Sequence, residues 1–164
     1  MMMSFPDERN DAKLRDLVDR IEISELVSRY VILLDTQDEN GFDDSWPGSI
    51  FTEDIRMELP IGTYEGLDGL AEFHYRAKSK FARTHHLSSN HSIAVDGDSA
   101  TVRCQMITTH VHPLSRPDRN SRRALFRIGG HYEAEAVRTD LGWRFRRWVC
   151  RVTWHEGSGS VEVY

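Results

Sequence analysis

Residues 84–105 read THHLSSNHSIAVDGDSATVRCQ, two segments of mixed polar and apolar residues on either side of Asp96-Gly97-Asp98. A glycine-containing junction of this kind, between segments that alternate in polarity, is typical of an antiparallel hairpin. The stretch therefore predicts two long strands, at roughly 82–95 and 99–112. Because it also holds three of the eight histidines of the chain, its register decides where they point.

Successive side chains of a strand point to opposite faces, so His85 and His86 cannot both face the interior. Strict alternation gives two sets, Thr84, His86, Ser88 and Asn90 on one face and His85, Leu87, Ser89 and His91 on the other. A three-residue turn at 96–98 pairs Val95 with Ser99 and Thr84 with His110, which makes His86 and His110 diagonal neighbours on one face, ~7–8 Å apart. A two-residue turn separates them unless a β-bulge restores the phase.

The rest of the chain places helices before the remaining long strands. From Leu14 to Leu34 the apolar residues recur in steps of three and four, which predicts an amphipathic helix. Helices are expected at about 10–35 and 67–81, a short helix or turn broken at Pro47 at 42–51, and strands at 55–59, 62–66, 124–137 and 142–155. This order indicates an α+β domain with a mostly antiparallel sheet.

Composition narrows the class of protein. The 164 residues suit one domain, expected at 11–156 between a disordered lead-in at 1–10 and a flexible tail at 157–164. The net charge of −5 argues against nucleic-acid binding. No apolar run reaches the ~18 residues of a membrane span, and the first residues lack the apolar core of a signal peptide. With Cys104 and Cys150 expected as buried thiols, a cytoplasmic location is expected.

The histidines could ligate a metal, act in catalysis or bond locally as strand residues. Adjacent His85 and His86 point oppositely, which disfavours joint ligation, and His110-Val111-His112 has no evident third ligand. No metal is therefore expected. Spacing alone favours strand histidines that bond locally over a catalytic site.

Four segments in order resemble the SnoaL-like branch of the nuclear transport factor 2-like superfamily, over about residues 12–155. They are SRYVILLD (28–35), GTYEGLDGLAEF (62–73), the histidine-rich hairpin and GGHYEAEAVRTDLGWRFRRW (129–148). The resemblance implies a curved mixed sheet that forms a cone-shaped barrel around a pocket, closed by N-terminal helices. The family includes dehydratases, a dehydrochlorinase and polyketide cyclases, together with members that only bind or assemble.

The resemblance also implies which residues act. The family spacing His-x-x-x-Asn falls on His86 and Asn90, the helix aspartate on Asp35, and further polar positions on Tyr30 and His110. A buried aspartate beside a histidine fixes the tautomer and increases the basicity of the ring, which suits removal of a carbon-bound proton. Tyr30 and His110 would be acids or oxyanion groups, and Asn90 would position substrate. The alternatives are a core aromatic at Tyr30 and a solvated helix end at Asp35.

The implied activity is that of a cofactor-independent lyase, a dehydratase, acting on a polyketide-, terpenoid- or steroid-like molecule. A cyclase or isomerase is the alternative, and a non-catalytic binding or assembly protein is the alternative of another class. The expected pocket lining is aromatic and apolar: Trp46, Phe51, Met57, Phe73, Met106, Tyr132, Trp148 and Trp154.

Two surface features complete the expectations. The convex strand face is predicted to carry Leu87, Ile107, Val111 and Val149. Through this face the protein is expected to form a homo-oligomer, a dimer ahead of a trimer. The arginine-rich segment 113–123 is expected to be a solvated loop, or alternatively a lid for an anionic substrate.

Overall fold

The computed structural model describes residues 8–36, 43–113, 125–157 and 159. Its elements are α1 (Glu8–Thr36), α2 (Pro47–Ile50), β1 (Phe51–Leu59), β2 (Gly62–Glu65), α3 (Leu70–Lys78), β3 (Arg83–Asp96), β4 (Ser99–Val111), β5 (Leu125–Thr139) and β6 (Gly142–Gly157). Residues 114–123 of the expected arginine-rich loop, the first seven residues and nearly all of the expected tail lie outside the described residues. None of the described helices combines the length and the apolar character needed to cross a membrane.

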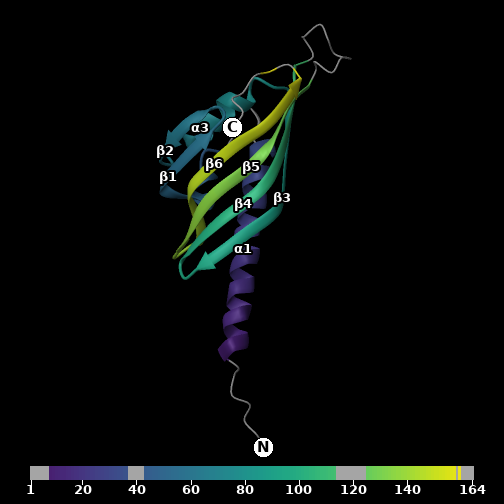
Figure 1. Cartoon of the computed structure of the whole chain (residues 1–164). Coiled ribbons are helices and arrows are strands. Elements are labelled where there is room, and N and C mark those ends of the chain that lie inside the picture. The colour runs from purple at the N-terminus through teal and green to yellow at the C-terminus, as the bar shows by residue number, and fades with distance from the viewer. Residues whose placement is uncertain (1–7, 37–42, 114–124, 158, 160–164) are drawn as a thin grey trace, which may run out of the picture.

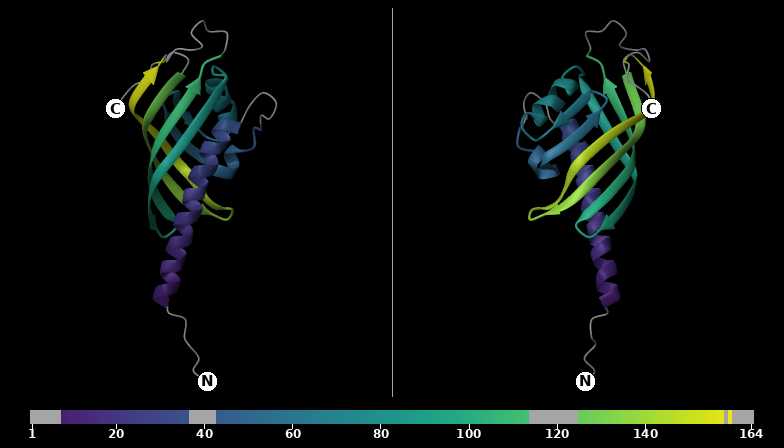
Figure 2. Two further views of the ribbon diagram at one scale, coloured as in Figure 1. Left: turned by 90° about the vertical axis from the view of Figure 1, so that its right-hand side faces the viewer. Right: turned by 60° about the vertical axis from the view of Figure 1, so that its left-hand side comes forward.

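The strands form one mixed sheet in the order β2-β1-β6-β5-β4-β3, in which only β1 and β6 run parallel. The four long strands curve together, and α1 runs along the concave side (Figure 1; Figure 2), where it packs chiefly against β3. The α+β class and the curved mixed sheet are thus confirmed. The sheet does not close by hydrogen bonds, so α1 and the α3 region complete the enclosure.

Helix α1 has two halves that differ in their surroundings. Its second half contributes Ile23, Leu26, Val27, Tyr30 and Val31 to the core. The first turns extend beyond the sheet (Figure 2), and the apolar residues there are exposed: Leu14, Leu17, Val18 and Ile21. The apolar periodicity therefore predicted the helix, but only its second half has a sheet to pack against.

Asp19 marks the point at which α1 enters the body of the protein. Its buried carboxylate accepts hydrogen bonds from Arg138 (2.7 Å) and from the Trp143 indole (3.1 Å). Burial alone would raise the pKa of Asp19, but these two hydrogen bonds and the charge of Arg138 hold it below its ordinary value. These two hydrogen bonds connect α1 to the β5–β6 hairpin.

The β3–β4 hairpin has a two-residue turn and a bulge. Asp96 pairs with Ser99, so the expected pairing of Val95 with Ser99 is wrong. The register shifts between Ser89 and Ser92, where Asn90 has a positive φ of 54°, a conformation that asparagine tolerates better than most residues. Beyond this bulge Thr84 pairs with His110 and His86 with Thr108, as predicted. The bulge thus restores the phase that the shorter turn would have lost.

The convex face of the sheet is partly apolar. Leu87 is 54% exposed, Ile107 45% and Trp154 42%. Val149, expected to be exposed on this face, is fully buried instead. The exposed apolar patch is therefore formed by Leu87, Ile107 and Trp154.

Gly130 provides a test of the packing of β5 on β6. The register shifts between Gly129 and Gly130, and a Cβ at Gly130 would overlap the carbonyl of Arg151. Gly130→Ala should lower the free energy of unfolding by about 1–3 kcal/mol, measured by urea denaturation. The control Gly48→Ala, whose Cβ would make only an ordinary contact with Leu67, should be neutral or slightly stabilising. A Gly130→Ala variant as stable as the parent would contradict the close packing.

Candidate active site

A cavity of about 380 Å³ opens on the concave side of the sheet. Its wall comes from the end of α1, from α3, from the β1–β2 turn and from the long strands. This volume lies within the ~300–1,000 Å³ typical of small-molecule sites. Most of the wall is apolar, with polar groups from a few histidines, tyrosines, threonines and lysines.

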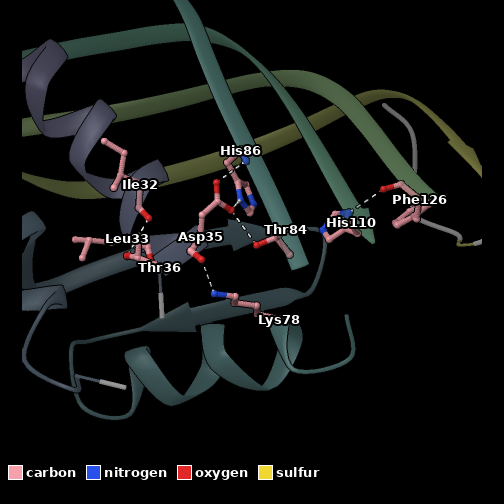
Figure 3. A network of polar contacts seen from close by, with 9 residues as sticks. All are labelled: Ile32, Leu33, Asp35, Thr36, Lys78, Thr84, His86, His110 and Phe126. Carbon is pink, nitrogen blue, oxygen red and sulfur yellow. Dashed lines mark hydrogen bonds and ion pairs between the residues drawn. The ribbon is translucent and has the colours of Figure 1, made fainter. Parts of the chain in front are cut away.

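Asp35, in the last turn of α1, holds His86 of β3 by two hydrogen bonds (Figure 3). Its Oδ1 lies 2.6 Å from Nδ1 of the His86 ring, and its Oδ2 accepts the His86 amide at 2.7 Å. The Thr84 hydroxyl donates to Oδ1 at 2.8 Å. Burial would raise the pKa of Asp35, but the His86 ring and amide and the Thr84 hydroxyl hold it below its ordinary value. Asp35 is therefore ionised at neutral pH.

The ionised carboxylate settles the tautomer of His86. Because Asp35 can only accept, Nδ1 of His86 carries the ring proton and Nε2 presents a lone pair. The His86 side chain is 15% exposed and lines the cavity. His85 is exposed and lies outside the lining. His86 can thus take a proton from a bound molecule.

Two lysines bring positive charge to the same cavity. The Lys78 ammonium donates a hydrogen bond to the backbone carbonyl of Asp35 at 2.7 Å, and both Lys78 and Lys80 line the cavity. Sequence reasoning did not select either residue. The charge of Lys78 beside the Asp35–His86 pair favours a negative charge that develops on a ligand.

His110 of β4 faces His86, with ring centroids 6.2 Å apart. Its Nδ1 lies 3.1 Å from the carbonyl of Phe126 (Figure 3). Burial lowers the pKa of His110 to about 4, although the bond to Phe126 opposes this. His110 is therefore neutral at pH 7, with its proton donated to Phe126. The acid role predicted from the sequence does not fit this state, since Nε2 can only accept.

Tyr30 is bonded to a residue that the sequence did not single out, His74 of α3. The Tyr30 hydroxyl lies 2.9 Å from Nε2 of His74, while Nδ1 of His74 lies 3.0 Å from the carbonyl of Leu70. Burial lowers the pKa of His74 to about 4, and burial raises that of Tyr30. The Leu70 carbonyl can only accept, so Nε2 of neutral His74 has no proton and Tyr30 donates to it. The one sequence signal for His74 was its place on the buried stripe of the helix, four residues after Leu70.

Of the expected lining residues, Trp46, Met106 and Tyr132 do line the cavity. Phe51, Met57 and Trp148 do not, because they are enclosed in the core behind its wall. Phe73 packs instead on Tyr64, with ring centroids 4.8 Å apart. The lining residues missed by sequence reasoning include Leu33, Leu34, Leu59, Phe81, Phe126 and Ile128.

The structure corrects three further expectations. Asn90 sits in the bulge, exposed and outside the lining, so it does not position a ligand there. Trp154 covers Gly129 from the convex side, where it borders a separate groove with Leu87. His91 turns to the side of α1, where its ring nitrogens lie 2.7 Å from the Ser24 hydroxyl and 3.1 Å from the Ser88 hydroxyl. Among the described residues, no group of three or more His, Cys, Asp or Glu side chains could hold a metal ion.

Comparison with known proteins finds the same architecture. The sequence model of the SnoaL-like domain matches residues 15–149. An uncharacterized protein of Mycobacterium tuberculosis, Rv2910c, is 29% identical over 147 residues, which cover 87% of this chain and 90% of that protein.

Solved structures extend the comparison. The Kfla4162 protein of Kribbella flavida has a TM-score of 0.76 at 24% identity, over 86% of this chain and 95% of that chain. A hexachlorocyclohexane dehydrochlorinase, LinA type 2, has a TM-score of 0.72 at 20% identity, over 93% and 97%. A Novosphingobium aromaticivorans protein with a provisional assignment as a scytalone dehydratase scores 0.72 at 23%, over 88% and 91%. At these identities the structures show a shared fold.

The buried state of His74 predicts a dependence of stability on pH. Its folded pKa of about 4 lies below the ordinary 6.5, so the unfolded chain binds the proton more readily between these values. The free energy of unfolding should be highest above pH 6.5 and should fall, by about 3 kcal/mol from this residue, as the pH drops to 4. His74→Gln, which does not titrate, should show a smaller decrease in urea denaturation at the same pH values. Equal decreases in both proteins would contradict a buried, neutral His74.

Proposed function

Because the chain belongs to the SnoaL-like domain family, we propose that it is a cofactor-independent lyase, a dehydratase, for a polyketide-, terpenoid- or steroid-like molecule. The observation that carries this proposal is the His86–Asp35 pair at the wall of a mostly apolar cavity. The similar structures include a dehydrochlorinase and a protein assigned as a dehydratase, whose names both describe elimination. These names support elimination as the class of reaction proposed for this chain.

In the proposed reaction, His86 acts first as a base and then as an acid. Its Nε2 removes the proton α to a carbonyl, and the electron pair of the C–H bond passes into an enolate. The enolate then forms the C=C bond as the β C–O bond breaks. The imidazolium, paired with Asp35, returns the proton to the departing hydroxide, which leaves as water. One residue serves both steps because Tyr30 and His110 have already donated their protons within the protein.

The lysine charge supports the enolate. Lys78 is hydrogen-bonded to the backbone of Asp35, so its ammonium lies close to the dyad that generates the negative charge. A fixed positive charge near a developing oxyanion lowers the barrier because it stabilises the transition state more than the neutral ketone. The same residues would serve a cyclase or isomerase, which also begins with removal of a carbon-bound proton.

Turnover of 3-hydroxy-1-tetralone tests the proposal, because loss of water from this two-ring ketone yields fluorescent 1-naphthol after tautomerisation. The parent protein should accelerate this loss, and His86→Ala should reduce the rate by about 10²–10⁴-fold. The control His85→Ala, whose side chain is exposed outside the cavity, should stay within a few-fold of the parent. Exchange of the α-proton for deuterium without loss of water would favour the isomerase or cyclase. Neither reaction in the parent would favour the binding protein.

Asp35 should act through His86. Asp35→Asn should lose activity to a similar or smaller extent than His86→Ala. It disturbs the orientation of the His86 ring and removes the charge that stabilises the imidazolium, but the imidazole itself stays in place. The double variant should be no slower than His86→Ala, since the two residues act as a unit. Rates are compared on variants whose circular dichroism matches the parent. Multiplicative losses would contradict the pairing.

For assembly we propose that the convex face mediates self-association. Three apolar residues are exposed there, Leu87, Ile107 and Trp154. The same residues border a groove that can receive a side chain of a second copy. Sedimentation at micromolar concentration should show a homo-oligomer, a dimer ahead of a trimer, and Leu87→Lys should dissociate it. The control Leu141→Lys changes a residue that is 79% exposed at the β5–β6 turn. A monomeric parent would contradict this assembly.

A further inference from the structure

Three polar groups of the cavity wall each donate their proton to another group of the protein. The Tyr30 hydroxyl donates to His74, the His86 ring donates to Asp35, and the His110 ring donates to the Phe126 carbonyl. The direction is unambiguous in each case, because a carbonyl or an ionised carboxylate only accepts and His74 has committed its own proton to Leu70. All three wall groups are therefore left with lone pairs.

Three acceptors therefore belong to residues of the wall: the oxygen of Tyr30 and Nε2 of both His86 and His110. The lining also contains the hydroxyl-bearing residues Tyr75, Thr108 and Tyr132, and Trp46, whose Nε1 has no hydrogen-bond partner among the described residues. A buried acceptor that loses water and gains no donor costs about 1–3 kcal/mol. A ligand that occupies the space beside these three acceptors must therefore bring donors of its own, while the apolar remainder of the wall favours a ring system.

We propose that the cavity selects ring compounds that carry hydroxyl groups, and that His74 is the positioning residue that makes Tyr30 an acceptor. His74 acts through Tyr30, because both of its own ring nitrogens are already bonded. The inference rests on the proposed function only in that it concerns the same cavity, and it is tested by binding alone. The ligand's hydroxyls are the features that the cavity recognises.

The lysines complement this selection. Lys78 and Lys80 are the cationic donors in the wall, and Lys78 adjoins Asp35 through its backbone carbonyl. A hydroxylated ketone would satisfy both kinds of group, with its carbonyl oxygen accepting from an ammonium and its hydroxyls donating to the acceptors. The Thr84 hydroxyl does not change this pattern, because its proton is directed to Asp35.

Calorimetric binding of three two-ring probes tests the inference: 1-naphthol, 1-methoxynaphthalene and 1-tetralone. The parent should bind 1-naphthol at least about tenfold more tightly than 1-methoxynaphthalene, the equivalent of one hydrogen bond. His74→Phe keeps an aromatic ring among Trp46, Tyr30 and Phe73, with which His74 makes edge contacts. It removes the acceptor for Tyr30, so the freed hydroxyl should donate to a ligand: 1-tetralone should bind more tightly and the preference for 1-naphthol should shrink.

Two further variants separate this role from simple packing. His74→Gln retains a side-chain oxygen that can accept from Tyr30, so it should restore the parent preference. Tyr30→Phe removes the acceptor oxygen and its proton together, so it should weaken the binding of 1-naphthol without strengthening the binding of 1-tetralone. This variant tests the same role if His74→Phe does not fold. No preference for 1-naphthol in the parent would overturn the selection. An unchanged order of affinities in folded His74→Phe, or in Tyr30→Phe, would overturn the role of His74 and Tyr30. Hydroxyl preference without any dehydration would instead refute the lyase and leave this inference standing.

Discussion

The bulge at Asn90 and His91 sets which side chains of β3 reach the cavity. Side chains alternate along a strand, so one inserted residue exchanges the two faces for everything on one side of it. Between the Gly97-Asp98 turn and the bulge, β3 is in one phase with β4; beyond it, His86 and His110 share the concave face. Without the bulge the two-residue turn would direct His86 to the convex surface, away from Asp35. The left-handed conformation of Asn90 is thus a local cost that places the dyad.

A second constraint is the direction of the hydrogen bonds around the cavity. Asp35 receives bonds from a ring, an amide and a hydroxyl, which keep it ionised and fix the His86 tautomer. On the other wall, backbone carbonyls at Leu70 and Phe126 fix the tautomers of His74 and His110. These bonds are made within the folded protein before any ligand enters, so the polarity of the cavity is preorganised. The same preorganisation leaves one residue, His86, to carry the proton between the two steps of an elimination.

This arrangement lowers the stability of the folded protein at acidic pH. Two imidazoles are held neutral by burial, and the pKa of each is lowered to about 4. Because the unfolded chain binds protons at these histidines more readily than the folded protein does, low pH shifts the equilibrium toward unfolding. The cavity needs them unprotonated, because a protonated His74 could no longer accept from Tyr30. The requirement for acceptors at the site and the loss of stability at low pH therefore have one physical origin.

Much of the architecture could be predicted from local patterns along the chain. The helix of α1, the long strands and the α+β class follow from apolar spacing, turn residues and the ordered family motifs, which depend on neighbours in sequence. The face shared by His86 and His110 depends on a bulge that these patterns left open. The choice of Asp35 and His86 came from the family resemblance, and their mutual contact is a property of the folded chain.

What the tertiary structure alone decided depends on residues far apart in the sequence. His74 and Tyr30 are forty-four positions apart, and no periodicity within α3 shows that its buried histidine meets a tyrosine of α1. Similarly, aromatic residues such as Trp148 and Trp154 look alike in sequence, yet one is enclosed in the core and the other lies on the convex face. The sequence by itself determined the elements, their order and the residue types available for proton transfer. Burial and hydrogen-bond direction, which arise only when distant segments pack, decided which of those residues donate, which accept and which never reach the cavity.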